Sequence, residues 1–141
     1  MKPTFTIRIY GIFIKDGQVL LSQERYGDMN MLKFPGGGLE YGESTLECLQ
    51  REMKEEYELE VKVTDHFYTT DFFVKSVFHT DTQVMSIYYT MEVLSENILV
   101  NMLFPHDKGE QFLVWKSLEE FNPNNLSFPI DQKVMGLLKT L

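Results

Sequence analysis

The stretch from Phe34 to Leu59 constrains the chain more than any other, because it joins three consecutive glycines to a segment dense in glutamate. Ser44 followed three residues later by Glu47 is a capping-box pattern, so we expect a helix to begin after Ser44. With a period of about 3.6 residues, one face of this helix is apolar and is expected to pack on a core. That face comprises Leu46, Leu49, Met53 and Tyr57. The stretch therefore predicts a glycine loop that leads into an amphipathic helix.

Glu52, Glu55 and Glu56 share a neighbouring face of the same expected helix. Like charges four residues apart oppose helix formation by about 0.2–0.5 kcal/mol per pair. Arg51 can offset part of this repulsion through Glu47 or Glu55, but it cannot sit among all three carboxylates. Mg²⁺ can, because it accepts carboxylate oxygens while keeping waters and phosphate oxygens in its shell. The alternative is a solvated acidic face, which is common on surface helices.

The fixed positions of this stretch resemble the signature of the Nudix hydrolase family, G-x5-E-x7-R-E-U-x-E-E-x-G-U, in which U is aliphatic. Gly37, Glu43 and the run Arg51–Leu59 match it at the same spacing, with one departure. The departure is Glu58, which stands where the family has glycine. A glycine just past a helix end adopts the left-handed conformation without steric penalty. Glu58 is therefore expected either to cost about 1 kcal/mol there or to let the helix run on.

The resemblance implies an α/β architecture in which a mixed β-sheet is sandwiched between α-helices, the Nudix fold. It also implies metal-dependent hydrolysis of a nucleoside diphosphate linked to a group X, with Mg²⁺ as cofactor and Mn²⁺ as a substitute. The metal ligands that it implies are Glu52 and Glu56, with Glu55 as a further ligand or one that acts through a water. The substrate-binding residues expected are Arg25, Gly36, Gly37, Gly38 and Asp131. Arg51 is expected to orient the carboxylates, and the proton acceptor is expected to be Glu52 or Glu110.

Three of these positions have an alternative interpretation. Arg25 ends the second expected strand, where Nudix proteins often carry a basic residue near the substrate phosphates, but a surface arginine is an equal alternative. Lys33, just before the glycines, has the same two interpretations. Asp131 lies where some triphosphate-cleaving relatives place a base-reading residue, and the alternative is a charge that stabilises a helix N-terminus.

The rest of the chain alternates strand signals with breaks. Asp16-Gly17 is a hairpin signal between two apolar runs. Without an internal repeat or long linker, residues 1–141 are expected to form a single domain that contains the signature at residues 37–59. The further elements expected are strands at Thr4–Ile14, Val19–Leu21, Val61–Val63, Phe67–Val74, from Val77, Val84–Leu94 and Phe112–Trp115, and a helix at Ile130–Leu141.

Composition narrows the possible partners. A net charge of −8 without a basic patch argues against polymeric nucleic acid, although a small phosphorylated substrate remains possible because a bound metal inverts the local field. We find no apolar run long enough for a membrane span and no leader-like segment, so the cytoplasm is the default location. Cys48 is the only cysteine, which excludes an intrachain disulfide. A homodimer is an open alternative.

The leading hypothesis is a Mg²⁺-dependent pyrophosphohydrolase. Its substrate would be a nucleoside triphosphate or a nucleoside diphosphate derivative, and its products a nucleoside monophosphate plus pyrophosphate or phosphorylated X. One alternative is an ADP-ribose or sugar-nucleotide pyrophosphatase. Another is a Nudix-fold module that senses a nucleotide without cleaving it, against which the intact Glu52, Glu55 and Glu56 argue.

Overall fold

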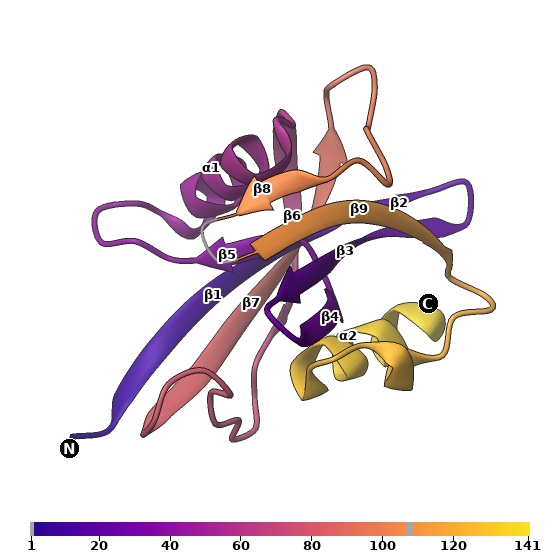
Figure 1. The fold of residues 1–141 in the computed structure, drawn as a ribbon. Coiled ribbons are helices and arrows are strands. Elements are labelled where there is room, and N and C mark those ends of the chain that lie inside the picture. Colours follow the sequence, from indigo (N-terminus) through magenta and orange to yellow (C-terminus); the bar gives the residue numbers. More distant parts are fainter. Residues whose placement is uncertain (1, 107–108) are drawn as a thin grey trace.

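The computed structural model describes residues 2–106 and 109–141, in which two helices flank the strands (Figure 1). The helices are α1 (Thr45–Tyr57) and α2 (Pro129–Lys139), and a 3-10 turn, η1 (Pro123–Asn125), precedes α2. The strands are β1 (Thr4–Ile12), β2 (Ile14–Lys15), β3 (Gln18–Tyr26), β4 (Met29–Lys33), β5 (Gly36–Gly38), β6 (Val61–Thr69), β7 (Thr82–Val93), β8 (Phe104–His106) and β9 (Gly109–Ser117). Neither helix is long and apolar enough to cross a membrane, within the residues described.

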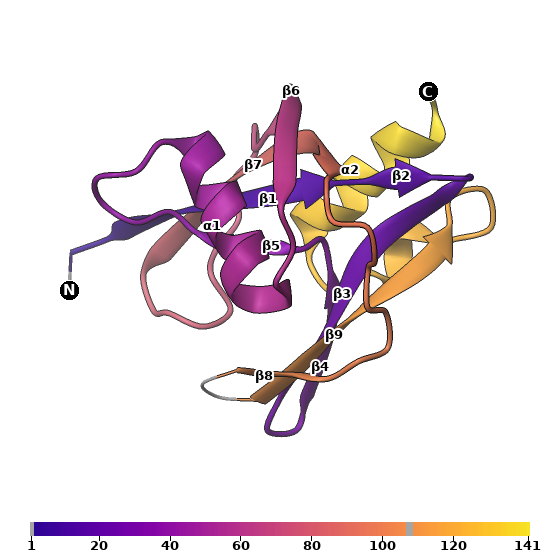
Figure 2. The same cartoon turned by 90° about the horizontal axis from the view of Figure 1, so that it is seen from above.

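The strands form two hydrogen-bonded sheets. One has the order β5-β1-β7-β6, in which β1 and β7 run parallel and the other neighbours antiparallel. The other has the order β2-β3-β9-β8, with β4 also paired to β3, and all its pairs are antiparallel. Figure 2 shows β3, β4 and β9 running obliquely away from β1. The fold is therefore the mixed-sheet α/β architecture expected from the sequence.

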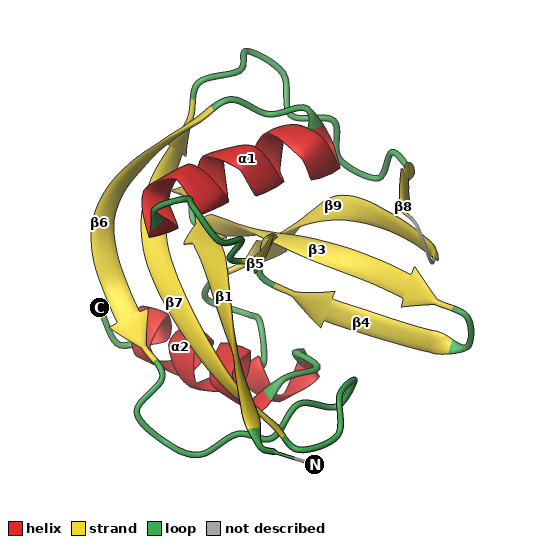
Figure 3. Ribbon diagram, turned by 90° about the vertical axis from the view of Figure 1, so that its left-hand side faces the viewer, coloured by secondary structure: helices red, strands yellow, loops and turns green. Residues whose placement is uncertain are grey.

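The two helices lie on opposite sides of the strands (Figure 3). Each packs on its own core cluster, because strand side chains alternate between two faces. On β1, for example, Ile9 contributes to the cluster under α1 and Tyr10 to the cluster under α2. Leu49 and Met53 of α1 and Val134 and Met135 of α2 are fully buried in these clusters. The alternation thus anchors α1 against β1 and β5.

Helix α1 begins as the capping box predicts. Ser44 Oγ accepts from the Glu47 backbone N–H at 3.1 Å, and Glu47 Oε1 accepts from the Ser44 backbone N–H at 2.9 Å. The helix ends at Glu58, which adopts the left-handed conformation with φ 56° and ψ 36°, so the chain turns there rather than running on. The expectation that Leu46 faces the core is wrong, since this side chain, in the first turn, is 44% exposed.

The Asp16-Gly17 turn joins β2 to β3 with positive φ at both residues, which confirms the predicted hairpin. Three expectations differ from the structure. The strand expected at Phe67–Val74 ends at Thr69, as the last part of β6. The three glycines form the short strand β5, paired antiparallel with β1, rather than an open loop. No strand begins at Val77 in the described chain; Val77 and Phe78 are instead exposed in the connection between β6 and β7. That connection becomes one wall of a cavity.

Candidate active site

Glu52 and Glu56, one turn apart on α1, both line a cavity of about 790 Å³. Its volume lies within the roughly 300–1,000 Å³ typical of small-molecule sites. The glycines of β5 line it beside α1, together with side chains from β1, β3, β4, β7, residues 74–79 and the start of α2. Apolar side chains contribute a large part of its lining, among them Met29, Met31, Val77, Phe78 and Phe128. The cavity thus combines a cluster of charges with an apolar wall.

The Glu52 carboxylate lies directly against Gly37 of β5. A Cβ atom at residue 37 would lie 2.3 Å from Glu52 Oε2 and 2.6 Å from Oε1, distances that side chains do not tolerate. Only glycine therefore leaves room for this carboxylate. The Glu52 residue is 9% exposed, and burial raises the pKa of its carboxyl group. Arg51 opposes this rise in pKa, whereas the negative charges of Glu56 and Glu55 add to it.

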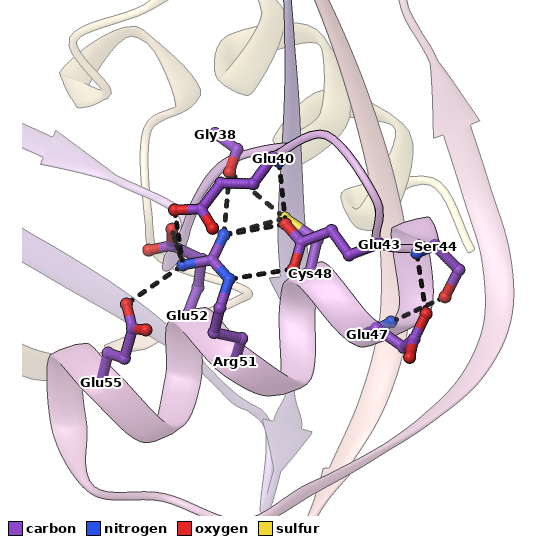
Figure 4. Close-up of polar contacts among 9 residues, drawn as sticks. All are labelled: Gly38, Glu40, Glu43, Ser44, Glu47, Cys48, Arg51, Glu52 and Glu55. Carbon is purple, nitrogen blue, oxygen red and sulfur yellow. Dashed lines mark hydrogen bonds and ion pairs between the residues drawn. The ribbon is translucent and has the colours of Figure 1, made fainter.

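Arg51 joins the loop before α1 to the acidic side chains of the helix (Figure 4). Its Nε and Nη2 donate to the two oxygens of Glu43, each at 2.9 Å, and Nη2 also donates to the carbonyl oxygen of Gly38 at 3.1 Å. Its Nη1 donates to Glu52 Oε1 and Glu55 Oε2, each at 3.0 Å. The hydrogen bonds from Arg51 lower the pKa of Glu43 to about 2. The guanidinium thus holds Glu52 in place through a hydrogen bond to its Oε1 atom.

Glu55 is not brought into the cavity with its two neighbours. Its carboxylate is paired with Arg51, its side chain is 59% exposed, and it is not among the described residues that line the cavity. Glu47, the other partner considered for Arg51, is engaged in the capping box with Ser44. The three glutamates expected to act together are therefore divided, with Glu52 and Glu56 on the cavity wall and Glu55 toward solvent.

Gln111 of β9 is a neighbour of Glu56 that the sequence did not single out. Its Nε2 donates to Glu56 Oε2. Gln111 is 1% exposed, and its Oε1 has no hydrogen-bond partner in the part of the chain that the structure describes. Buried polar atoms without a partner are uncommon. The amide therefore holds Glu56 and keeps an unused acceptor.

Among residues 2–106 and 109–141, no group of three or more His, Cys, Asp or Glu side chains is placed to hold a metal ion by itself. The donors present nevertheless fit Mg²⁺ bound together with its substrate. Mg²⁺ is usually held through one or two carboxylates, while waters and substrate phosphates complete its shell. Glu52 and Glu56 supply two carboxylates on the wall of one cavity. Because residue 37 is glycine, the Glu52 carboxylate occupies the space that a side chain of residue 37 would otherwise fill.

Arg8 and Lys33 bring positive charge to the same cavity. Arg8, on β1, donates through Nε to the hydroxyl of Tyr10 at 2.6 Å. Lys33, on β4, lies 3.3 Å from Glu24 Oε1, and the two side chains are 5% and 10% exposed. Arg8 and Glu24 were not predicted from the sequence as site residues. Lys33 was one of its two candidates for a basic residue near the phosphates.

Arg25 and Glu110 are not brought to the cavity. They face each other across the β3–β9 pair, one position along from the opposed residues Glu24 and Gln111. Because successive side chains of a strand point to opposite faces, the buried Glu24 and Gln111 point inward, and Arg25 and Glu110 point outward. Both outward residues are exposed, and Arg25 Nε donates to Asn30 Oδ1 at 3.4 Å. The sequence identified the two strands but not the inward-facing residue of each.

Asp131, in the first turn of α2, does line the cavity and is 2% exposed. Its Oδ1 accepts from the Tyr88 hydroxyl, and its Oδ2 accepts from the Phe34 backbone N–H at 3.4 Å. Burial raises the pKa of Asp131 to about 6, although the hydrogen bond from Tyr88 opposes the rise. Asp131 is therefore a buried, hydrogen-bonded group on the cavity wall and not a solvent-exposed charge at a helix N-terminus.

A family model described as the NUDIX domain matches residues 3–136. The fold is similar to that of the E. coli ORF135 protein, with a TM-score of 0.75 and 24% identity over 99% of this chain and 91% of that one. It is also similar to the MutT protein from Methanosarcina mazei Go1, with a TM-score of 0.75 and 16% identity over 99% and 96% of the two chains. An ADP-ribose pyrophosphatase from Streptococcus suis 89-1591 gives a TM-score of 0.61 and 16% identity over 96% and 92%. No curated protein matches the chain.

Proposed function

The chain belongs to the NUDIX family of hydrolases, and from this premise we propose that it is a Mg²⁺-dependent pyrophosphohydrolase of a small nucleotide. Water attacks a phosphorus atom of a nucleoside triphosphate or nucleoside diphosphate derivative, and the phosphoanhydride bond breaks. The products are a nucleoside monophosphate and pyrophosphate or phosphorylated X. The observation that carries the proposal is the Glu52 carboxylate seated against Gly37, beside Glu56 on the same cavity wall.

In this proposal Glu52 and Glu56 hold the divalent cation, which when bound neutralises phosphate charge and activates the attacking water. Arg51 fixes Glu52 through a 3.0 Å hydrogen bond, and Gln111 fixes Glu56. Both carboxylates therefore start from a position set by a second side chain, which limits the reorganisation needed on binding. Glu55 has a peripheral role, because its carboxylate is already paired with Arg51 in solvent.

Glu52 is our candidate for the group that accepts the proton of the attacking water. Of the two residues considered, only Glu52 lines the cavity, whereas Glu110 lies on the outer face of β9. Burial raises the pKa of Glu52, and a carboxylate with a raised pKa is a better proton acceptor near neutral pH than an ordinary one. Arg51 positions this group without touching the substrate.

The cavity supports a nucleotide as the substrate class. Charged side chains lie beside α1 and β5, where a polyphosphate would meet the carboxylates, and aromatic side chains line the wall formed by Phe78 and Phe128. At about 790 Å³ the cavity also has room for a larger X group, so an ADP-ribose or sugar-nucleotide pyrophosphatase is the second candidate. We further propose that residues 1–141 work as one domain, in the cytoplasm, on small molecules rather than polymers.

The test is a phosphate-release assay with added pyrophosphatase, run across a panel of nucleotides, ADP-ribose and sugar nucleotides with Mg²⁺. Replacing Glu56 by Gln is expected to lower kcat at least ~10²-fold, because it removes charge that acts on the transition state. Glu55→Gln is the matched control on the same helix and is expected to change kcat less than ~5-fold. Near-normal turnover by Glu56→Gln would refute the ligand assignment. Tight nucleotide binding without release above blank would favour the sensing module.

A further inference from the structure

Arg8 and Lys33 approach the same aromatic ring from two different strands. The Arg8 Cζ atom lies 5.6 Å from the centroid of the Tyr10 ring, and the Lys33 Nζ atom lies 5.3 Å from it. Both side chains line the cavity that Glu52 and Glu56 also line. Lys33 is 4% exposed and Arg8 is half-buried, so both cations are held at the cavity wall rather than in bulk solvent. Keeping cations there requires compensation by an anion.

Groups of the described chain compensate the positive charges of Arg8 and Lys33 only in part. A guanidinium has five N–H donors, and Arg8 uses Nε for the hydroxyl of Tyr10. Its Nη1 atom lies beside Gly38, 3.7 Å from where a Cβ atom of that residue would stand. No carboxylate of the described residues forms an ion pair with Arg8, whereas Lys33 is paired with Glu24. Arg8 therefore presents a planar pair of donors next to the glycine strand.

The charges around the cavity show what these donors can bind. The cations that line it are Arg8, Lys33 and Lys75, and the carboxylates are Glu24, Glu52, Glu56 and Asp131. In the proposed function Glu52 and Glu56 bind a divalent cation. Arg8 and Lys33 are then the protein's positive charges next to that cation that remain for the phosphate. Arginine binds phosphate oxygens through two parallel N–H···O bonds, and lysine binds them as a point charge.

We propose that Arg8 on β1 and Lys33 on β4, which both lie beside the Tyr10 ring, are the phosphate-binding cations of this cavity. They bind phosphoryl oxygens of a diphosphate whose other oxygens face Glu52 and Glu56. Arg25, the other basic residue considered from the sequence, is not part of this site, because it points outward from β3. The substrate's identity rests on the proposed function, but recognition of a diphosphate by these two cations does not require turnover.

Calorimetric titration of the full chain with inorganic pyrophosphate and Mg²⁺ tests the proposal directly. Arg8→Met is expected to weaken pyrophosphate binding by about 10–100-fold, and to raise the KM of whichever nucleotide is turned over by a similar factor. Arg25→Met removes the same charge from the outer face and is expected to change both quantities less than ~2-fold. Equal effects of the two variants, or a larger effect of Arg25→Met, would overturn the proposal.

Two further variants separate binding from folding. Arg8→Lys keeps the charge but not the planar fork, so it is expected to recover part of the affinity lost in Arg8→Met. If Arg8→Met does not fold, wild-type affinity in Arg8→Lys would overturn the proposal, and a loss of several-fold would support it. Lys33→Met leaves Glu24 buried without its partner, and the Glu24→Gln/Lys33→Met double variant removes that defect. We expect the double variant to regain stability but not pyrophosphate affinity. Recovery of both would mean that Lys33 only neutralises Glu24.

Failure of this inference and failure of the proposed function give different results. Pyrophosphate binding that depends on Arg8, without turnover of any nucleotide, would remove the proposed hydrolase and leave the phosphate site. Nucleotide turnover with an unchanged KM in Arg8→Met would leave the hydrolase and remove the phosphate site.

Discussion

Replacing Gly37 by Ala tests whether the glycine is there to admit the Glu52 carboxylate. The added Cβ would meet Glu52 Oε2 at 2.3 Å, and ordinary contact begins near 3.4 Å, so the carboxylate must recede by about 1 Å. The atoms that must move belong to the end of a flexible side chain, and Gly37 has no positive φ, so the backbone can stay in place. The fold is expected to survive while the carboxylate is misplaced.

A misplacement of about 1 Å in an active site can lower turnover by about 100-fold. We therefore expect Gly37→Ala to lower kcat by about that factor, while the free energy of unfolding changes by about 1 kcal/mol or less, because only one partly exposed ion pair, to Arg51, is disturbed. The neighbouring glycines supply the controls. At Gly38 an added Cβ meets only Arg8 Nη1, at 3.7 Å, so Gly38→Ala is expected to affect turnover little. At Gly36, φ is 151° and the Ile9 carbonyl oxygen would lie 2.1 Å away, so Gly36→Ala is expected to destabilise the fold.

The assays are kcat by phosphate release and stability by urea unfolding, for all three variants. The pattern expected is lost turnover with retained stability for Gly37→Ala, and lost stability for Gly36→Ala. Wild-type kcat in Gly37→Ala would refute the reasoning, since it would mean that the position of the Glu52 carboxylate against the strand does not matter. Equal losses of turnover at Gly37 and Gly38 would refute it as well.

Two other predictions concern stability. Burial raises the pKa of Asp131 from its usual value near 3.8 to about 6. The carboxyl group therefore contributes its full stabilisation of the folded state below about pH 4, where it is protonated, and this contribution is lost as the pH rises through about 6. Asp131→Asn is therefore expected to gain stability relative to the wild type between about pH 4 and pH 7 in urea unfolding, and a difference independent of pH would contradict this. Glu58 has a positive φ of 56° at the end of α1, so Glu58→Gly is expected to raise the free energy of unfolding by about 1 kcal/mol. An unchanged or lower urea midpoint would show that the left-handed residue is not strained.

The start and the charged face of α1 could be predicted because the signals are local. The Ser44–Glu47 capping box and the spacing of Glu52 and Glu56 are set by residues within a few positions of one another. The hairpin at Asp16-Gly17 was predictable for the same reason. Exposure of Leu46 was not predictable, because the periodicity of a helix defines a face but not how far the core beneath it extends.

The inward residues of β3 and β9 could not be predicted in the same way. A shift of one residue moves every side chain of a strand to the other face, and the pairing of Glu24 with Gln111 is fixed by contacts far apart in the sequence. The basic residue at the end of β3 was therefore placed in the site, although its neighbour Glu24 faces the cavity. Arg8 lies on β1, remote in sequence from the glutamates, and only the β1–β5 pairing brings it to Gly38.

The central claim is that Glu52 and Glu56, seated beside the glycine strand, bind a divalent cation together with a polyphosphate. Titration of Mg²⁺ into the protein by calorimetry, with and without a nucleotide that the panel identifies as bound, measures this directly. We predict that nucleotide strengthens Mg²⁺ binding and that the Glu52→Gln/Glu56→Gln variant loses the nucleotide-dependent part. No uptake of the cation with nucleotide present, or the same uptake by the double variant, would contradict the account.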